Sequence, residues 1–315
     1  MTLLSKIQKR YNWIYSRYRD YYFLRDNLHQ KNKSTLFIGS SYTLFGVIPS
    51  ADNVILALQS QDIYYSYKIL QKYLTINEHK PLNVYLGLGY YALYHDLSLT
   101  KSDDENNRIH DIYYPLFKDL HNMPFDWYKK TCARFCFVDK CIKFFVCEKF
   151  NFIKTERERD YFNKKITRIS KSRKTWKDIS KEWKNLTFNE KENAANKRVA
   201  GHEKILKYNN TREENKEIMK KIKELCEKKG CNLYIFIAPM SEQYLKSMSN
   251  MYKEKSNELI SFLKELNVNV MDFNISCCFK EDDFVDADHL DEQGAIKLSL
   301  IINSQQLEDF YLVKN

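Results

Sequence analysis

Short apolar runs, rich in β-branched and aromatic residues, recur along this chain, and stretches with helical spacing separate them. Such runs are typical of buried strands in a parallel sheet, because helices cover both faces of that kind of sheet. The runs occupy residues 34–39, 53–58, 82–89, 232–239 and 268–273. They predict an α/β fold, a three-layer α/β/α sandwich with a five-stranded parallel sheet.

Apolar residues at helical spacing follow most of these runs. Asp62 is the expected N-cap of one helix, and Gly230 is the expected stop of another. A further segment near the amino end has Tyr at helical spacing with Lys and Arg between. It suits a helix packed against the first strand better than a helix lying on a membrane surface. The predicted helices cover residues 3–30, 63–74, 217–229, 252–266 and about 291–300.

The alternation of strand and helix patterns stops between the third and fourth runs. Residues 98–212 have only charged and aromatic helical patterns. The whole chain, with 7 Gly and 5 Pro in 315 residues, lacks the turn residues of an all-β fold. We therefore expect a single domain over residues 1–315, with residues 98–212 as a helical insertion.

Part of that insertion is strongly basic, in a chain whose formal net charge is +10. Basic residues alternating with aromatic ones can follow an anionic polymer such as nucleic acid or an acidic glycan. The other interpretation, a solvated helix face whose Trp side chains pack inward, is favoured because no known nucleic-acid module surrounds the segment. The basic segment, residues 164–184, contains Lys164, Lys165, Arg168, Lys171, Arg173, Lys174, Lys177, Lys181 and Lys184, with Trp176 and Trp183.

The 8 Cys residues form no CxxC pair and have no His nearby in a zinc pattern. Buried free thiols and the lack of a signal peptide favour a reducing cytoplasm, with peripheral attachment at the inner membrane face as an alternative. No run of about 18 apolar residues is present, so we expect no membrane-spanning segment. No motif requires a metal or an organic cofactor.

Two short motifs have the residue types of nucleophilic catalysis. Gly39-Ser40-Ser41 follows the first strand run, and Asp286-Ala287-Asp288-His289 precedes the last helix. Because the carboxyl ends of parallel strands share one edge of the sheet, we expect the two motifs to meet there. His289 would then accept the proton of Ser41 while a carboxylate orients its ring.

Each role has a second candidate in the same motif. Ser40 is the alternative nucleophile to Ser41, and Asp288 is the alternative orienting carboxylate to Asp286. Either motif alone is weak, since Gly and Ser are common in turns and a D-x-x-H is usually a solvated loop. Together, in a parallel-sheet pattern, they favour a catalytic triad of Ser41, His289 and Asp286.

These residues resemble the SGNH/GDSL hydrolases, a flavodoxin-like superfamily of esterases, lipases and polysaccharide O-acyl transfer or deacetylation enzymes. The family's first motif is matched at residues 37–43, with Ser41 as nucleophile, and its D-x-x-H motif at residues 286–289. A His-Leu pair followed by Gly294 is similar to the branch that acts on cell-surface polysaccharides and teichoic acids. The resemblance covers roughly residues 34–97 and 215–305, and implies a flavodoxin-like sheet.

The resemblance also implies an oxyanion hole built from the loops after the second and third strands. In the second loop the backbone N–H of Ser60 is the expected donor. The third loop, with Gly89, Tyr90 and Tyr91, lacks the family's Asn. A Tyr hydroxyl or a backbone N–H from this loop is expected to replace that Asn.

The resulting functional hypothesis is a serine-dependent ester hydrolase or O-acyltransferase that acts on an acylated carbohydrate in surface-polysaccharide metabolism. Its partners would be the acylated carbohydrate or acyl donor, with an anionic substrate at the basic insertion. The alternative is a non-catalytic scaffold of the same fold that binds an anionic glycan or nucleic acid through the basic segment 164–184.

Overall fold

The structure is a computed structural model that describes residues 20–100, 103–123, 183–275, 278–304 and 311–313. Its internal contacts divide the chain into two compact units. One unit comprises Met1–Asp26 and Leu97–Lys171, and the other Asn27–Asp96 and Ser172–Asn315. The second unit contains the sheet and both predicted catalytic motifs.

Five parallel strands form the sheet in the order β2-β1-β3-β4-β5. This is the flavodoxin-like order, and it confirms the predicted α/β fold. A short sixth strand, which the sequence patterns did not predict, pairs with β5 in the antiparallel direction. The strands are β1 Thr35–Gly39, β2 Asn53–Ala57, β3 Asn83–Leu88, β4 Asn232–Ile237, β5 Asn269–Asp272 and β6 Tyr311–Val313.

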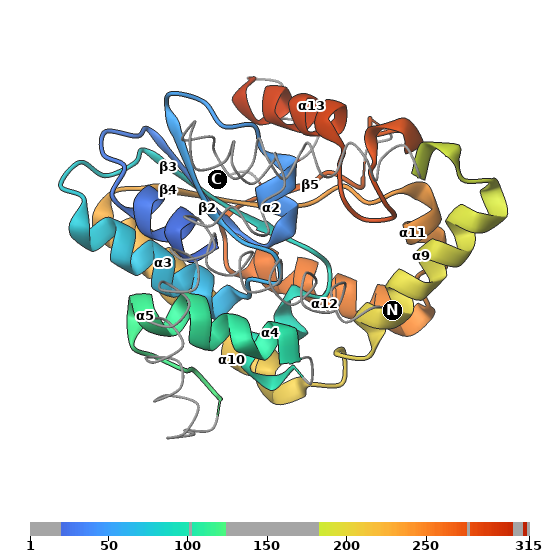
Figure 1. Ribbon diagram of the computed structural model, residues 1–315, viewed down its shortest axis with the longest axis horizontal. Helices are drawn as coiled ribbons and strands as arrows, with labels where there is room; N and C mark the ends of the chain where they lie inside the picture. Colours follow the sequence, from blue (N-terminus) through green and yellow to red (C-terminus); the bar gives the residue numbers. More distant parts are fainter. Residues whose placement is uncertain (1–19, 101–102, 124–182, 276–277, 305–310, 314–315) are drawn as a thin grey trace, which may run out of the picture. The chain divides into compact units, whose positions relative to one another are not determined.

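Helices cover both faces of the sheet (Figure 1). On one face α2 packs against α13, and on the other α3 packs against α10, with α12 beside them. Two further helices, α9 and α11, contact each other beyond the carboxyl ends of the strands. These helices are α2 Ser41–Gly46, α3 Ile63–Ile76, α9 Phe188–Glu203, α10 Asn209–Lys229, α11 Glu242–Ser247, α12 Asn250–Glu265 and α13 Glu292–Asn303.

Local sequence signals explain most helix ends. The Asp62 carboxylate accepts the backbone N–H of Tyr65 at the start of α3, and Gly230 ends α10 in the left-handed conformation. However, α10 begins eight residues earlier than the pattern predicted, at Asn209 instead of Glu217. Its start has no side-chain cap; instead the buried Asn215 donates hydrogen bonds to the carbonyls of Leu93 and His95. This extension therefore depends on tertiary contacts, which helical periodicity does not reveal.

Close approach of α2 to the sheet depends on two glycines. Gly39 and Gly87 are register partners on β1 and β3, and the Thr43 side chain of α2 lies over them. The Thr43 hydroxyl donates to the carbonyl of Ile38 at 3.0 Å. A Cβ on Gly87 would lie 2.2 Å from Thr43 Oγ1 and 2.4 Å from the Phe236 ring. Glycine at this position thus lets α2 begin directly at the end of β1.

The other unit has short helical elements in its described part. These are η2 Leu97–Leu99, α4 Asp103–Arg108, the π-helical η3 Ile109–Tyr113 and α5 Tyr114–Phe117. Arg108 donates to the fully buried carboxylate of Asp20 at 2.9 Å, so this unit contains a buried ion pair of its own. Among the described residues between Leu88 and Asn232 no strand occurs.

Two expectations lie mostly outside the described residues. The basic segment 164–184 is described only at Trp183, which is buried, and Lys184, which forms an ion pair with Asp291. Of the helix expected over residues 3–30, the structure describes residues 20–30, and residues 20–28 are helical. In the described part of the chain, no helix has the length and apolar character needed to span a membrane.

We predict that Gly87→Ala lowers the free energy of unfolding by about 1–3 kcal/mol, because the added methyl group overpacks the contact between α2 and the sheet. Denaturant unfolding measures this change. The matched control is Gly201→Ala in α9, where an added Cβ meets no atom within 4 Å. That control should stabilise the protein by about 0.5–1 kcal/mol. Equal stability of Gly87→Ala and the wild type would contradict this role of Gly87.

Candidate active site

Ser41 lies where β1 ends and α2 begins, at the carboxyl edge of the sheet. Gly39 adopts a φ of 131°, a conformation that suits glycine, and turns the chain out of the strand. Ser40 is the N-cap of α2, and Ser41 is the first helical residue. The backbone N–H of Ser41 belongs to the first turn, where amides have no partner within the helix. Ser41 therefore presents a hydroxyl and an amide at the same edge.

His289 lies in a short loop held closed by backbone hydrogen bonds. The N–H of Val285 donates to the carbonyl of His289 at 2.9 Å, and the N–H of Asp291 donates to the carbonyl of Asp283 at 2.8 Å. Gly294, in the first turn of α13, packs against this loop: a Cβ there would lie 2.2 Å from the Asp283 carbonyl oxygen. This explains why the sequence has a glycine five residues after the histidine.

The structure brings Ser41, His289 and Asp286 together. Ser41 Oγ lies 2.9 Å from His289 Nε2, although 248 positions separate the two residues in sequence. His289 Nδ1 lies 3.1 Å from both carboxylate oxygens of Asp286. Asp286 Oδ1 also accepts the backbone N–H groups of Asp288 and His289, which fixes the carboxylate. This arrangement places a proton on Nδ1 and leaves Nε2 to accept the Ser41 proton.

Aromatic rings of α2 fix the His289 imidazole from the other side. The Tyr42 ring stacks on it at a centroid distance of 5.2 Å, and the Phe45 ring meets it edge-on at 5.9 Å. The imidazole is buried, with 6% of the side chain exposed. Its position is thus determined by the same short helix that carries Ser41.

The pKa values of this pair shift in opposite directions. Burial alone would lower the pKa of His289, but the carboxylates of Asp286 and Asp288 raise it above its usual value. Burial alone would raise the pKa of Asp286, but the charge and the hydrogen bond of His289 lower it to about 2. Asp286 therefore remains ionised at neutral pH and stabilises a proton on His289.

Asp288 also lies near the ring but has other partners. Its Oδ1 is 3.4 Å from His289 Nδ1, whereas Arg198 Nε lies 2.9 Å from both of its oxygens. The Tyr42 hydroxyl donates to Asp288 Oδ2 at 2.8 Å. The Asp288 side chain is 1% exposed, and both of its oxygens have hydrogen-bond donors. Its main electrostatic partner is therefore Arg198. Asp286 has the shorter contacts to His289, as the motif spacing predicts.

A chain of buried polar groups continues behind Asp288. His202 Nε2 lies 3.9 Å from Asp288, and its Nδ1 lies 2.6 Å from the Tyr244 hydroxyl. The Tyr244 and Tyr252 hydroxyls are 2.7 Å apart. Burial lowers the pKa of His202 to about 3, so its ring is neutral at physiological pH. These groups surround Asp288 with polar side chains, and His202 adds no second positive charge to the site.

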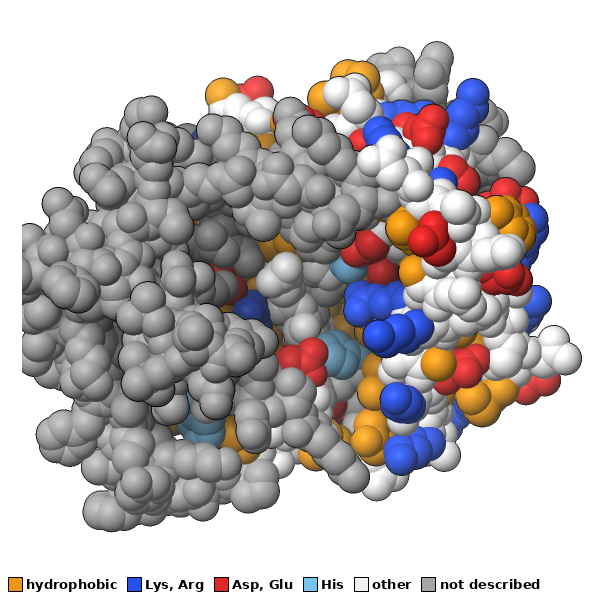
Figure 2. Space-filling model, turned by 45° about the vertical axis from the view of Figure 1, so that its right-hand side comes forward, with side chains coloured by type: hydrophobic (Ala, Val, Ile, Leu, Met, Phe, Trp, Pro, Cys, Tyr) orange, Lys and Arg blue, Asp and Glu red, His pale blue; other side chains and the backbone are white. Residues whose placement is uncertain are grey.

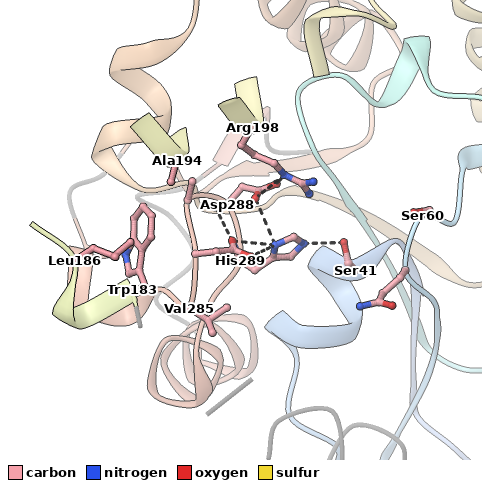
Figure 3. Close-up of a pocket in the computed structure, with 12 residues that line it drawn as sticks. Ser41, Ser60, Trp183, Leu186, Ala194, Arg198, Val285, Asp288 and His289 are labelled. Carbon is pink, nitrogen blue, oxygen red and sulfur yellow. Dashed lines mark hydrogen bonds and ion pairs between the residues drawn. The ribbon is translucent and has the colours of Figure 1, made fainter. Parts of the chain in front are cut away.

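Ser41 and His289 line a cavity of about 500 Å³ (Figure 3). The space-filling view, which brings the side of α9 and α11 forward, shows histidine, acidic and basic side chains together in a hollow of that face (Figure 2). The cavity wall has polar and apolar parts. Its other lining residues are Gln59, Ser60, Trp183, Leu186, Ala194, Arg198, Val285, Asp286, Ala287 and Asp288.

The predicted oxyanion residues do not all reach this cavity. Ser60 lines it beside Ser41 and has a left-handed φ of 56°; its carbonyl contacts His95 Nε2 at 3.2 Å. Gly89 and Tyr91 line a separate space of about 20 Å³, which Ser60 also borders. The Tyr90 hydroxyl donates to the buried Asp272 at 2.8 Å and lines neither space. Of the predicted donors, Ser60 is therefore the one placed beside Ser41.

Three of these acidic and histidine side chains lie close enough together to hold a metal ion. Ligand atoms of Asp286, Asp288 and His289 lie within 4.8 Å of one another. Arg198 already pairs with both oxygens of Asp288, and Nδ1 of His289 faces Asp286. These contacts use the same atoms that a cation would need, so the geometry suits a proton relay better than a metal centre.

Arg198 and His202 are site residues that the sequence patterns did not identify. They are four residues apart on α9, so both project from one side of that helix. This i, i+4 spacing is the one sequence feature that links the two residues, but it does not show which part of the protein that side of the helix contacts. No protein-family model matches this chain, and a search of curated proteins returns no significant match. Function is therefore inferred from the fold and from the geometry of this site.

We predict that Asp286→Asn lowers the pKa of His289, because one of two facing carboxylates loses its charge. An NMR titration of the His289 ring protons measures the shift. Asp283→Asn is the matched control, since Asp283 contacts Lys297 and not His289. An unchanged pKa in Asp286→Asn would contradict the assigned pairing.

The same pKa shifts give a pH dependence of folding stability. His289, whose pKa is raised on folding, adds stability that is complete below about pH 6.5 and is lost as the pH rises through its folded pKa. Asp286, whose pKa falls to about 2, adds stability above about pH 4 that is lost as the pH falls towards 2. The pair thus stabilises the fold most between about pH 4 and 6.5.

Proposed function

We propose that this protein is a serine-dependent acyl-transfer enzyme that forms an acyl-enzyme on Ser41. The observation that supports this most strongly is the relay from Ser41 Oγ to His289 Nε2 at 2.9 Å and from His289 Nδ1 to Asp286 at 3.1 Å. Nucleophile, base and orienting carboxylate at these distances are the arrangement that activates a serine hydroxyl. The relay also lines a cavity large enough for a small ester.

In the proposed first step, Ser41 Oγ attacks the carbonyl carbon of an ester while His289 Nε2 takes the hydroxyl proton. The tetrahedral intermediate collapses, the carbon–oxygen bond to the alcohol breaks, and His289 returns the proton to the departing oxygen. The backbone N–H of Ser41 and the Ser60 loop are the proposed oxyanion donors. Imidazolium formed in this step is stabilised by Asp286, which raises the pKa of His289.

In the second step, His289 takes a proton from water or from an alcohol, whose oxygen attacks the acyl carbon. The bond from that carbon to Ser41 Oγ then breaks, and His289 returns the proton to Ser41 Oγ. Water gives an esterase, and a sugar hydroxyl gives an O-acyltransferase. We propose an acylated carbohydrate as the substrate. The resemblance to the SGNH/GDSL hydrolases suggests it, and a cavity that combines hydrogen-bonding groups with the apolar Leu186 and Ala194 is compatible with a sugar. The alternative, binding of an anionic glycan or nucleic acid through the basic segment 164–184, stays a prediction, because residues 164–182 lie outside the described residues.

We predict that Ser41→Ala and His289→Gln each lower kcat on short p-nitrophenyl acyl esters by at least about 10³-fold, because both groups act in the same step. Steady-state kinetics of the purified protein measures this loss. Ser40→Ala is the discriminating control: the Ser40 side chain caps α2, so its loss should cost about 1 kcal/mol of stability and little activity. Retention of full activity by Ser41→Ala would reject the proposed function.

A further inference from the structure

The guanidinium of Arg198 is only partly used by the protein itself. Its Nε donates to Asp288, 2.9 Å from each carboxylate oxygen, while the side chain remains 43% exposed and lines the cavity beside Ser41. In the described part of the chain, no acceptor takes the N–H groups of its two terminal nitrogens. Four donors on a permanently charged group are thus available to a molecule in the cavity.

The position of this guanidinium is fixed before any ligand arrives. Asp288 is buried and is itself held by the Tyr42 hydroxyl at 2.8 Å. The pKa of Arg198 is lowered by burial but raised more strongly by Asp288, Tyr42 and Tyr91, so it stays charged. An arginine held through Nε loses little conformational entropy when its terminal nitrogens bind a ligand.

In Figure 3 the terminal nitrogens of Arg198 lie above the His289 ring and are directed towards the side where Ser41 and Ser60 are drawn. Trp183, Leu186 and Ala194 lie at the opposite end. When the carbonyl carbon of an ester lies at Ser41, the rest of the ester occupies the cavity that the Arg198 guanidinium also lines.

The carboxylates of Asp288 and Asp286 offset the charge of Arg198, so its contribution to an anion comes from its terminal N–H donors, which neither carboxylate takes. The carboxylate of Asp286 is engaged by His289 and by two backbone N–H groups, and Asp288 by Arg198 Nε and Tyr42. Lys184, which follows the cavity-lining Trp183 in the sequence, is paired with Asp291 at 2.9 Å. Among the described residues that line the cavity, Arg198 is the one lysine or arginine, and its terminal N–H donors face the cavity.

We propose that Arg198 is a specificity-determining residue that binds an anionic group, a phosphate or a carboxylate, on the substrate attacked by Ser41. This inference rests on the proposed function, because only that function makes the bound anion a substrate. Two terminal nitrogens in one plane match two oxygens of either group, which a lysine does not. The substrate class is then an ester that carries a negative charge close to the acyl group.

Binding of unreactive probes tests this proposal without turnover. Isothermal titration calorimetry of the full-length Ser41→Ala protein compares phenylphosphonate, benzoate and neutral benzamide. We expect at least one anion to bind about 10- to 100-fold tighter than benzamide, the range for hydrogen bonds to a charged group. Tighter binding of phenylphosphonate identifies a phosphate site, and tighter binding of benzoate a carboxylate site.

When Arg198→Gln is introduced into the Ser41→Ala protein, the preference for the anion should be lost. Arg198→Lys should reduce the preference several-fold, because lysine lacks the two coplanar nitrogens that match two oxygens of the anion. Arg198→Gln leaves Asp288 without its partner, so the double variant Arg198→Gln/Asp288→Asn provides a neutral pair if the single variant does not fold. The ratio of anion to benzamide affinity within each protein removes effects common to all probes.

Equal binding of anions and benzamide by Ser41→Ala, or an anion preference that survives Arg198→Gln, would overturn the inference. Failure of the proposed function looks different. If the wild type turns over no ester but binds the anion through Arg198, the anion site stands and acyl transfer is rejected.

Discussion

The hydrogen bond between Ser41 and His289 joins residues from opposite ends of the chain, and it depends on the direction of the strands. All five central strands are parallel, so the segments that follow β1 and β5 emerge at one edge of the sheet. Any reversal of one of these strands would move its loop to the other edge. The hydrogen bond also requires that α2 start immediately at that edge. The glycines Gly39 and Gly87, which are register partners, allow this start.

Around this hydrogen bond, two carboxylates of one loop have separate tasks. Asp286 faces Nδ1 of His289 and holds its proton, while Asp288 pairs with Arg198 and receives the Tyr42 hydroxyl. Leaving Asp288 buried without a positive partner would cost on the order of a few kcal/mol. The ion pair therefore ties α9, which belongs to the sequence between β3 and β4, to the loop that carries His289. Through this contact the helical region becomes part of the site.

The fold and the core of the site could be predicted because their signals are local. Each of the five parallel strands is a short apolar run, and Asp286 and His289 share one motif before α13. Gly294 illustrates a local signal whose cause needs the structure: it keeps a side chain away from the Asp283 carbonyl.

Other features depend on tertiary contacts and were missed or misplaced. Nothing in the α9 sequence shows that Arg198 reaches Asp288, because the path of that helix is set by distant residues. Tyr90 was a predicted oxyanion residue, but its hydroxyl is taken by Asp272 on β5. β6 was missed because three residues carry too little periodicity to indicate a strand.

The most direct test of the central claim is to locate the covalent adduct formed with a fluorophosphonate, which reacts preferentially with an activated serine. Mass spectrometry of the intact protein followed by peptide mapping should find one phosphonyl group, on Ser41. The rate of its formation should fall steeply when His289 is replaced. Absence of an adduct, or an adduct on Ser40, Ser60 or another residue with Ser41 unmodified, would contradict the account.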